Sequence, residues 1–160
     1  MKIVFHIGLS KTGSTLIQFF CLENRAKLLD NGILFPQTGL SISPDGRNLR
    51  SSGHLFFMTA LRNNQTAIFD ELHREIAEYK NVNTLLISSE NFSFQPGLAS
   101  SLKNSFKSYK DVKVIVYLRR QDLYLESLYS EFCLWWFSQI ISQSGGIHFG
   151  LSRKNVRCNL

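Results

Sequence analysis

Residues 8–15, Gly-Leu-Ser-Lys-Thr-Gly-Ser-Thr, contain the residue types that bind phosphate in proteins. They follow an apolar run at 3–5 and precede an amphipathic stretch at 16–29, a pattern that predicts strand, turn and helix in that order. Such a turn directs unpaired backbone N–H groups at a ligand, and the helix dipole adds about half a positive charge. The candidate binding residues are therefore Gly8, Lys11, Thr12, Gly13, Ser14 and Thr15, and the expected ligand is a phosphate or a group of similar shape.

The position of Lys11 distinguishes this turn from the Walker A loop, Gly-x-x-x-x-Gly-Lys-Ser/Thr. Here the lysine comes three residues after Gly8 and before Gly13, so its ammonium lies elsewhere relative to the backbone amides. The order Gly-x-x-Lys-Thr-Gly-Ser-Thr resembles the 5′-phosphosulfate loop of sulfotransferases, which use 3′-phosphoadenosine 5′-phosphosulfate (PAPS) as donor. The alternative is a tight strand-to-helix turn with a solvated lysine.

A second set of residues follows the apolar run at 112–118. Arg119 comes directly after that run, and Ser127 lies eight residues further on in a helical stretch that Asp122 is expected to cap. In the sulfotransferases that the loop resembles, an arginine and a serine at this spacing bind the 3′-phosphate of the donor. A guanidinium fork matches phosphate oxygens, and a hydroxyl adds one more donor. The alternative is a surface arginine paired with a neighbouring carboxylate, and Arg120 is expected to be solvated.

Two residues are candidates for the base, because the resemblance implies sulfuryl transfer to a hydroxyl or amine that must lose a proton. Glu90 follows the apolar run at 84–88 and is the first choice, with a carboxylate that stabilises a loop or helix as its alternative. His54 lies beside a polar loop at 37–53, where a solvated or structural histidine is the alternative. Lys11 completes the expected catalytic set by stabilising the bridging oxygen as the S–O bond breaks. This chemistry requires no metal, and no metal is expected.

Composition limits the classes of partner. The 160 residues fit one domain, predicted over 1–143, followed by an irregular basic tail at 144–160. The net charge of +6 suits an anionic ligand or an acidic acceptor, whereas the absence of a dense Lys/Arg block argues against nucleic acid. The three cysteines have neither metal-binding nor disulfide spacing. No signal peptide and no membrane-spanning run are recognisable, so a cytoplasmic protein is expected.

Apolar runs alternate with amphipathic stretches along the chain. Strands are predicted at 3–5, 33–36, 84–88 and 112–118, the second at a sheet edge because Pro36 cannot continue a central strand. Helices are predicted at 14–30, 54–61, 66–80, 96–109 and 123–140, with Pro96 at the start of the fourth. This alternation favours an α/β fold with three layers, a mostly parallel sheet flanked by helices. The resemblance implies the P-loop NTPase-like version, in which Lys11, Glu90 and Arg119 all follow strand ends.

Together these residues favour a sulfotransferase that moves a sulfuryl group from PAPS to an acceptor hydroxyl, and the polar loop at 37–53 favours a carbohydrate acceptor. Family members are longer than this chain and carry a later basic, glycine-containing segment, so the sequence is interpreted as a C-terminally shortened member. Two alternatives stay open. One is an inactive, truncated nucleotide-binding or interaction domain. The other is a P-loop kinase, in which Glu90 takes the place of the acidic residue that holds magnesium.

Overall fold

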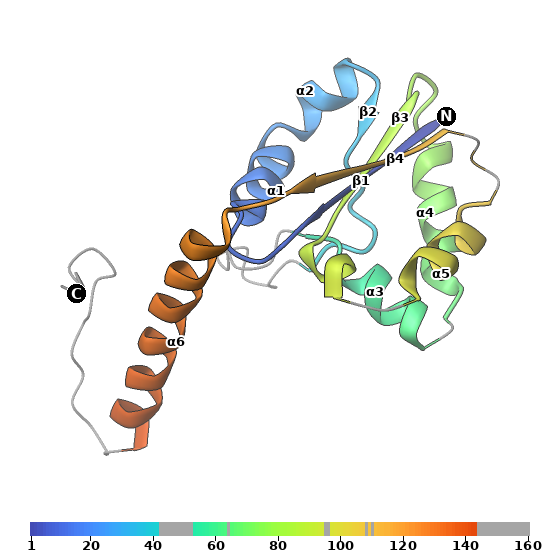
Figure 1. Ribbon diagram of the computed structural model, residues 1–160. Coiled ribbons are helices and arrows are strands. Elements are labelled where there is room, and N and C mark those ends of the chain that lie inside the picture. The colour runs from blue at the N-terminus through green and yellow to red at the C-terminus, as the bar shows by residue number, and fades with distance from the viewer. Residues whose placement is uncertain (42–52, 64, 95–96, 108, 110, 144–160) are drawn as a thin grey trace. The chain divides into compact units, whose positions relative to one another are not determined.

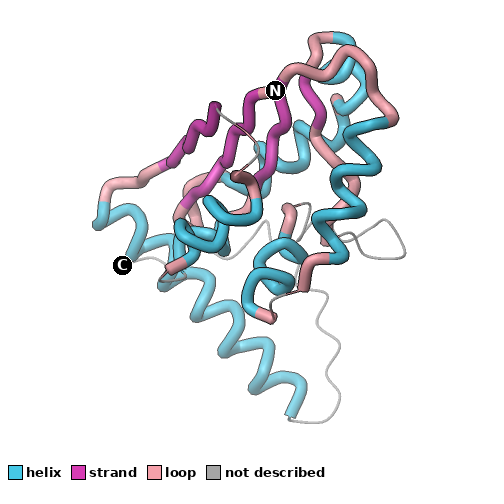
Figure 2. The backbone as a smooth tube through the Cα atoms, turned by 90° about the vertical axis from the view of Figure 1, so that its right-hand side faces the viewer, coloured by secondary structure: helices cyan, strands magenta, loops and turns pink. Residues whose placement is uncertain are grey.

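Four parallel strands form one sheet in the part of the chain that the structure describes (Figure 1). The structure is a computed structural model and describes residues 1–41, 53–63, 65–94, 97–107, 109 and 111–143. The strands are β1 (Lys2–Gly8), β2 (Ile33–Leu34), β3 (Thr84–Ser88) and β4 (Asp111–Tyr117). Their order is β2-β3-β1-β4, and Figure 2 shows them side by side from a second direction. The parallel sheet and its helical connections confirm the α/β class.

The chain divides into two compact units, Met1–Leu118 and Arg119–Leu160, and each is described by itself. The first unit contains the sheet and most of the helices: α1 (Ser14–Glu23), α2 (Arg25–Asp30), α3 (Leu55–Arg62), α4 (Ala67–Ala77), the 3-10 helix η1 (Glu90–Phe94) and α5 (Leu98–Ser105). The second unit contains α6 (Gln121–Gln143). Among the described residues, no helix combines the length and the apolar character needed to cross a bilayer.

Helices cover both faces of the sheet in the first unit (Figure 1). On one face, Ile3 and Phe5 of β1 pack into a cluster with side chains from α3, α4 and η1. On the other face, Leu86 of β3 packs against a smaller cluster that includes Cys21 of α1 and Phe35. The alternation follows from strand geometry, because successive side chains point to opposite faces.

The connections after β1 and β3 leave the sheet on opposite faces. The chain that follows β1 enters α1, which packs on the Leu86 face, whereas the chain that follows β3 enters η1 and packs on the Phe5 face. Because β1 and β3 are neighbours in the sheet, their carboxyl ends flank a point where the connections diverge. In open α/β sheets, ligands bind in the crevice at such a switch point.

Several predicted elements differ in extent from those observed. The helix predicted over 14–30 is two helices, because Asn24 leaves helical geometry at φ −103° and ψ 21° and its side-chain Nδ2 donates to the carbonyl of Phe20 at the end of α1. The helix η1 was not expected, and α5 begins at Leu98. Pro96, most of the predicted loop at 37–53 and the predicted tail at 144–160 lie outside the described residues.

Candidate functional site

The turn after β1 has an unusual backbone. Lys11 has a φ of 65°, in the left-handed region that residues with a Cβ seldom adopt, and Gly13 has a φ of 87°. The hydroxyl of Thr12 donates to the carbonyl of Leu9 at 2.6 Å, which closes the turn on itself. Gly13 is the N-cap of α1, and its carbonyl accepts the first helical hydrogen bonds. The sharp turn therefore leads straight into the positive end of the α1 dipole.

Gly8 is required at the base of the turn for reasons of space. A Cβ at this position would lie 2.9 Å from Oγ1 of Thr12 and 3.6 Å from Cβ of Ser14. Either the Thr12 hydroxyl would leave Leu9 or the turn would open. Ser14 itself is 4 % exposed, whereas Thr15 is exposed. Of the two hydroxyls that begin α1, Ser14 therefore lies against the base of the turn and Thr15 faces outward.

Glu90 lies beside this turn, as the sequence order of strand ends suggested. The backbone N–H of Ser89 donates to the carbonyl of His6 at 3.0 Å, and the hydroxyl of Ser93 donates to the carbonyl of Gly8 at 3.0 Å. Gln18 of α1 supplies a third connection, because its Nε2 donates to Oε2 of Glu90 at 3.0 Å. Glu90 is only partly buried. These contacts fix a partly accessible carboxylate next to the Lys11 turn.

His6 lies beneath the turn and pairs with Ser88 across the sheet. Its Nδ1 lies 2.7 Å from Oγ of Ser88, in register between β1 and β3. Its Nε2 is buried and has no hydrogen-bond partner among the described residues. Burial lowers the pKa of His6, against the opposing effect of the Glu90 charge. His6 is therefore neutral near pH 7 and supports the base of the turn from within β1, two residues before the strand ends at Gly8.

His54 occupies a different kind of position from Glu90. The side chain is fully buried, its Nε2 donates to the carbonyl of Pro36 at 3.1 Å, and its Nδ1 accepts from the N–H of Ser88 at 3.1 Å. Burial lowers its pKa to about 4, although the backbone hydrogen bonds and Glu75 act in the opposite direction. Both nitrogens of the neutral ring are engaged, and these contacts favour the structural alternative for His54 over proton transfer.

Arg119 and Ser127 belong to the second unit, so the predicted 3′-phosphate pair stays a prediction. Arg119 directly follows the last residue of the first unit, and Ser127 is the seventh residue of α6. The neighbouring Arg120 forms an exposed ion pair with Asp122, with Nε–Oδ1 and Nη2–Oδ2 distances of 2.6 and 2.5 Å. Asp122 lies one residue inside the start of α6, so it occupies the first helical turn rather than the cap position before it.

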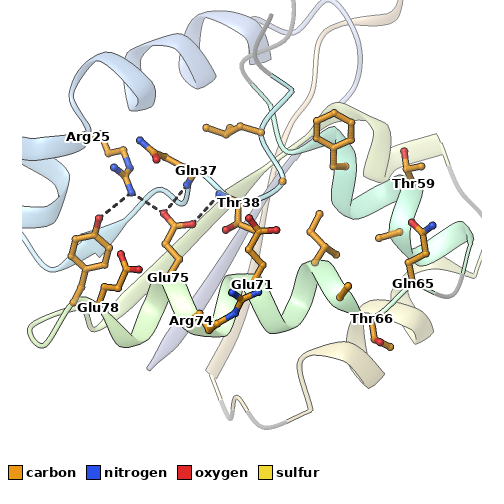
Figure 3. A pocket seen from close by; sticks show the side chains of 17 residues that line it. Arg25, Gln37, Thr38, Thr59, Gln65, Thr66, Glu71, Arg74, Glu75 and Glu78 are labelled. Atoms are coloured by element: carbon orange, nitrogen blue, oxygen red, sulfur yellow. Dashed lines mark hydrogen bonds and ion pairs between the residues drawn. The ribbon is translucent and has the colours of Figure 1, made fainter. Parts of the chain in front are cut away.

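A separate hollow of about 1240 Å³ lies between α2, α3 and α4 (Figure 3). Its wall contains a clamp centred on Glu75, whose carboxylate accepts from the N–H groups of Gln37 and Thr38 at 2.8 and 2.9 Å. Arg25 approaches the same carboxylate at 2.8 Å and also donates to the carbonyl of Phe35. The Glu75 carboxylate is thus bound by Arg25 and by the backbone N–H groups of Gln37 and Thr38. The clamp holds the segment after β2 against α4, which is a structural role.

Gln18, Ser93 and the His6–Ser88 pair are site residues that the sequence interpretation did not identify as such. A signal for Gln18 was present, because it lies one helical turn after Ser14 within an otherwise apolar stretch. Ser93 gave no signal, since η1 itself was not predicted. Among the described residues, no group of histidine, cysteine and acidic side chains is arranged to hold a metal ion.

Comparisons of the chain with protein-family models, with curated protein sequences and with solved structures found no match.

Proposed function

We propose that this chain is a sulfotransferase that binds PAPS at the Lys11 turn and transfers its sulfuryl group to an acceptor hydroxyl. The observation that carries the proposal is the meeting of the turn with Glu90 at the carboxyl ends of β1 and β3. Ser93 and Gln18 connect the two at 3.0 Å each. An anion-binding turn beside a partly accessible carboxylate supplies the two functions that the reaction needs, a donor site and a base.

In this reaction the acceptor oxygen attacks sulfur in line with the bond to the bridging oxygen. The new O–S bond forms as the old S–O bond breaks, and the bond electrons leave on the 5′-phosphate of adenosine 3′,5′-bisphosphate. Glu90 takes the proton of the acceptor hydroxyl. Lys11 and the amides at the start of α1 stabilise the charge that grows on the leaving oxygen. His54 has a structural role in this scheme, because both of its ring nitrogens are engaged.

The proposal includes a P-loop NTPase-like fold and a 3′-phosphate site made by Arg119 and Ser127. The resemblance of the turn and the spacing of these two residues support both. The left-handed Lys11 adds support for a site at the turn, because strained backbone conformations concentrate where ligands bind.

Calorimetric titration of the full chain with adenosine 3′,5′-bisphosphate tests donor binding. Arg119→Ala should weaken this binding about 10-fold or more, since a charged hydrogen bond to phosphate is lost. Arg120→Ala is the matched control, because Arg120 pairs with Asp122 on the surface and should leave the affinity unchanged. Adenosine 5′-phosphate, which lacks the 3′-phosphate, should bind both arginine variants and the original chain alike.

The same titration separates the proposed function from its two rivals. A preference for ATP with magnesium over the bisphosphate would indicate a P-loop kinase and overturn the sulfotransferase. No binding of either nucleotide would indicate an inactive interaction domain. Once binding is established, a screen of hydroxyl acceptors with labelled PAPS tests the carbohydrate acceptor that the polar loop at 37–53 favours.

A further inference from the structure

Gln18 is the buried polar side chain that contacts the proposed base. It is 2 % exposed, and its Nε2 donates to Oε2 of Glu90 at 3.0 Å. Glutamine is an unusual residue to bury, and a buried amide is retained at low energetic cost only when its groups are hydrogen-bonded. The contact leaves the second carboxylate oxygen of Glu90 outside this hydrogen bond, on a residue that is only partly buried.

Gly53 restricts the Gln18 carboxamide from the other side. A Cβ at position 53 would lie 2.8 Å from Nε2 of Gln18, closer than real Cβ atoms approach, and 3.1 Å from its Oε1, tighter than most real Cβ contacts. Its φ lies outside the left-handed region, so the backbone at position 53 accepts any residue, but a side chain there would have to displace the Gln18 carboxamide. The amide is therefore enclosed between Glu90 and Gly53, which leaves it little rotational freedom.

Helix α1 links this contact to the Lys11 turn. Ser14 and Gln18 are four residues apart and both buried, so they lie on the same face of α1. Ser14 lies at the base of the turn, and Gln18 lies about 6 Å further along the axis, at 1.5 Å per residue. One rigid helix therefore carries both the start of the donor site and the side chain that holds the carboxylate.

We propose that Gln18 is a positioning residue that fixes Glu90 at a set distance from the donor turn. This inference rests on the proposed function, since it assigns Glu90 the role of base. Gln18 touches Glu90 and acts through it. Loss of the contact lets the carboxylate rotate away from the acceptor, and a displacement of about 1 Å in a reacting group costs up to about 100-fold in rate.

The experiment measures release of labelled sulfate from labelled PAPS, with water as acceptor, alongside binding of adenosine 3′,5′-bisphosphate. Gln18→Met keeps the length of the side chain and removes the donor, so kcat should fall about 10- to 100-fold with the donor KM and bisphosphate affinity unchanged. Gly53→Ala keeps the glutamine at position 18 but displaces its carboxamide, so it should cause the same fall in kcat. Gln65→Met, an exposed glutamine outside the site, is the matched control and should have no effect.

A double-mutant cycle distinguishes positioning from a general loss of structure. In the Glu90→Gln background, Gln18→Met should cause no further fall in kcat, because the residue that it positions is already disabled. An equal fall in both backgrounds, an unchanged kcat in Gln18→Met, or bisphosphate binding with no sulfate release from the original chain would overturn the inference. Failure of the original chain to bind the bisphosphate would instead overturn the proposed function. If Gln18→Met does not fold, Gly53→Ala carries the same test.

Discussion

The buried imidazole of His54 should make the stability of the protein depend on pH in a defined window. Burial lowers its pKa to about 4 from an ordinary 6.5, and the neutral ring donates to Pro36 and accepts from Ser88. The folded state therefore resists protonation, whereas the unfolded chain takes up a proton below pH 6.5. Between these two values the unfolded state binds more protons, so the free energy of unfolding falls as the pH falls.

The magnitude follows from the two pKa values. The contribution of His54 is complete above pH 6.5, decreases by about 1.4 kcal/mol for each pH unit below it, and is lost near pH 4. The total is about 3 kcal/mol, a large share of the 5–15 kcal/mol that stabilises a typical domain. His6 acts in the same direction, since burial also lowers its pKa. The diagnostic quantity is therefore the difference between the original chain and a His54 variant.

The assay is urea unfolding followed by far-ultraviolet circular dichroism across this pH range. His54→Gln retains an amide that can reach Pro36 but does not titrate, so it should be less stable near neutral pH by about 1–2 kcal/mol through lost packing and the lost Ser88 contact. Its disadvantage should shrink as the pH falls, because it lacks the proton penalty. If the free energy of unfolding depended on pH in the same way for both proteins, the reasoning would be refuted, because His54 would then not be held neutral.

Three other changes test the clamp and the turn. Glu75→Gln should destabilise the protein by about 2 kcal/mol, measured by urea unfolding, because its carboxylate accepts two backbone N–H groups and faces Arg25. Burial raises the Glu75 pKa, but these partners lower it further than burial raises it. The stability that the Glu75 carboxylate contributes is present above its ordinary pKa of 4.5 and is lost as the pH falls through its lower pKa in the folded state. That pH range lies below most of the range in which His54 acts. Gly8→Ala should displace the Thr12 hydroxyl and weaken bisphosphate binding about 10-fold in calorimetry; unchanged affinity would contradict the packing at Gly8. Lys11→Asn keeps a residue that tolerates the left-handed backbone, so the turn should stay folded while bisphosphate affinity falls at least about 10-fold in calorimetry, and an unchanged affinity would contradict this account.

Local patterns in the sequence were sufficient for most of the elements. The strand at 84–88 was predicted with the bounds that β3 has, because a short apolar run flanked by polar residues is a strong local signal. The edge position of β2 followed from Pro36, which has no N–H for a further strand. The break at Asn24 was missed, because the periodicity of the apolar residues continues across it and only the hydrogen bonds to Phe20 reveal it.

The sequence by itself determined the chemistry that residues 8–15 offer, since the order of glycine, lysine and hydroxyl residues is a local property. Only the tertiary structure decided which distant residues share that site. Glu90 and Gln18 are 72 positions apart and meet because β1 and β3 are neighbours whose connections leave on opposite faces.

The tertiary structure also distinguished the two candidate bases. The sequence favours Glu90 after a strand over His54 beside a polar loop, but it does not show how either side chain is enclosed. Burial and hydrogen bonding are set by packing, which encloses His54 and leaves Glu90 partly accessible.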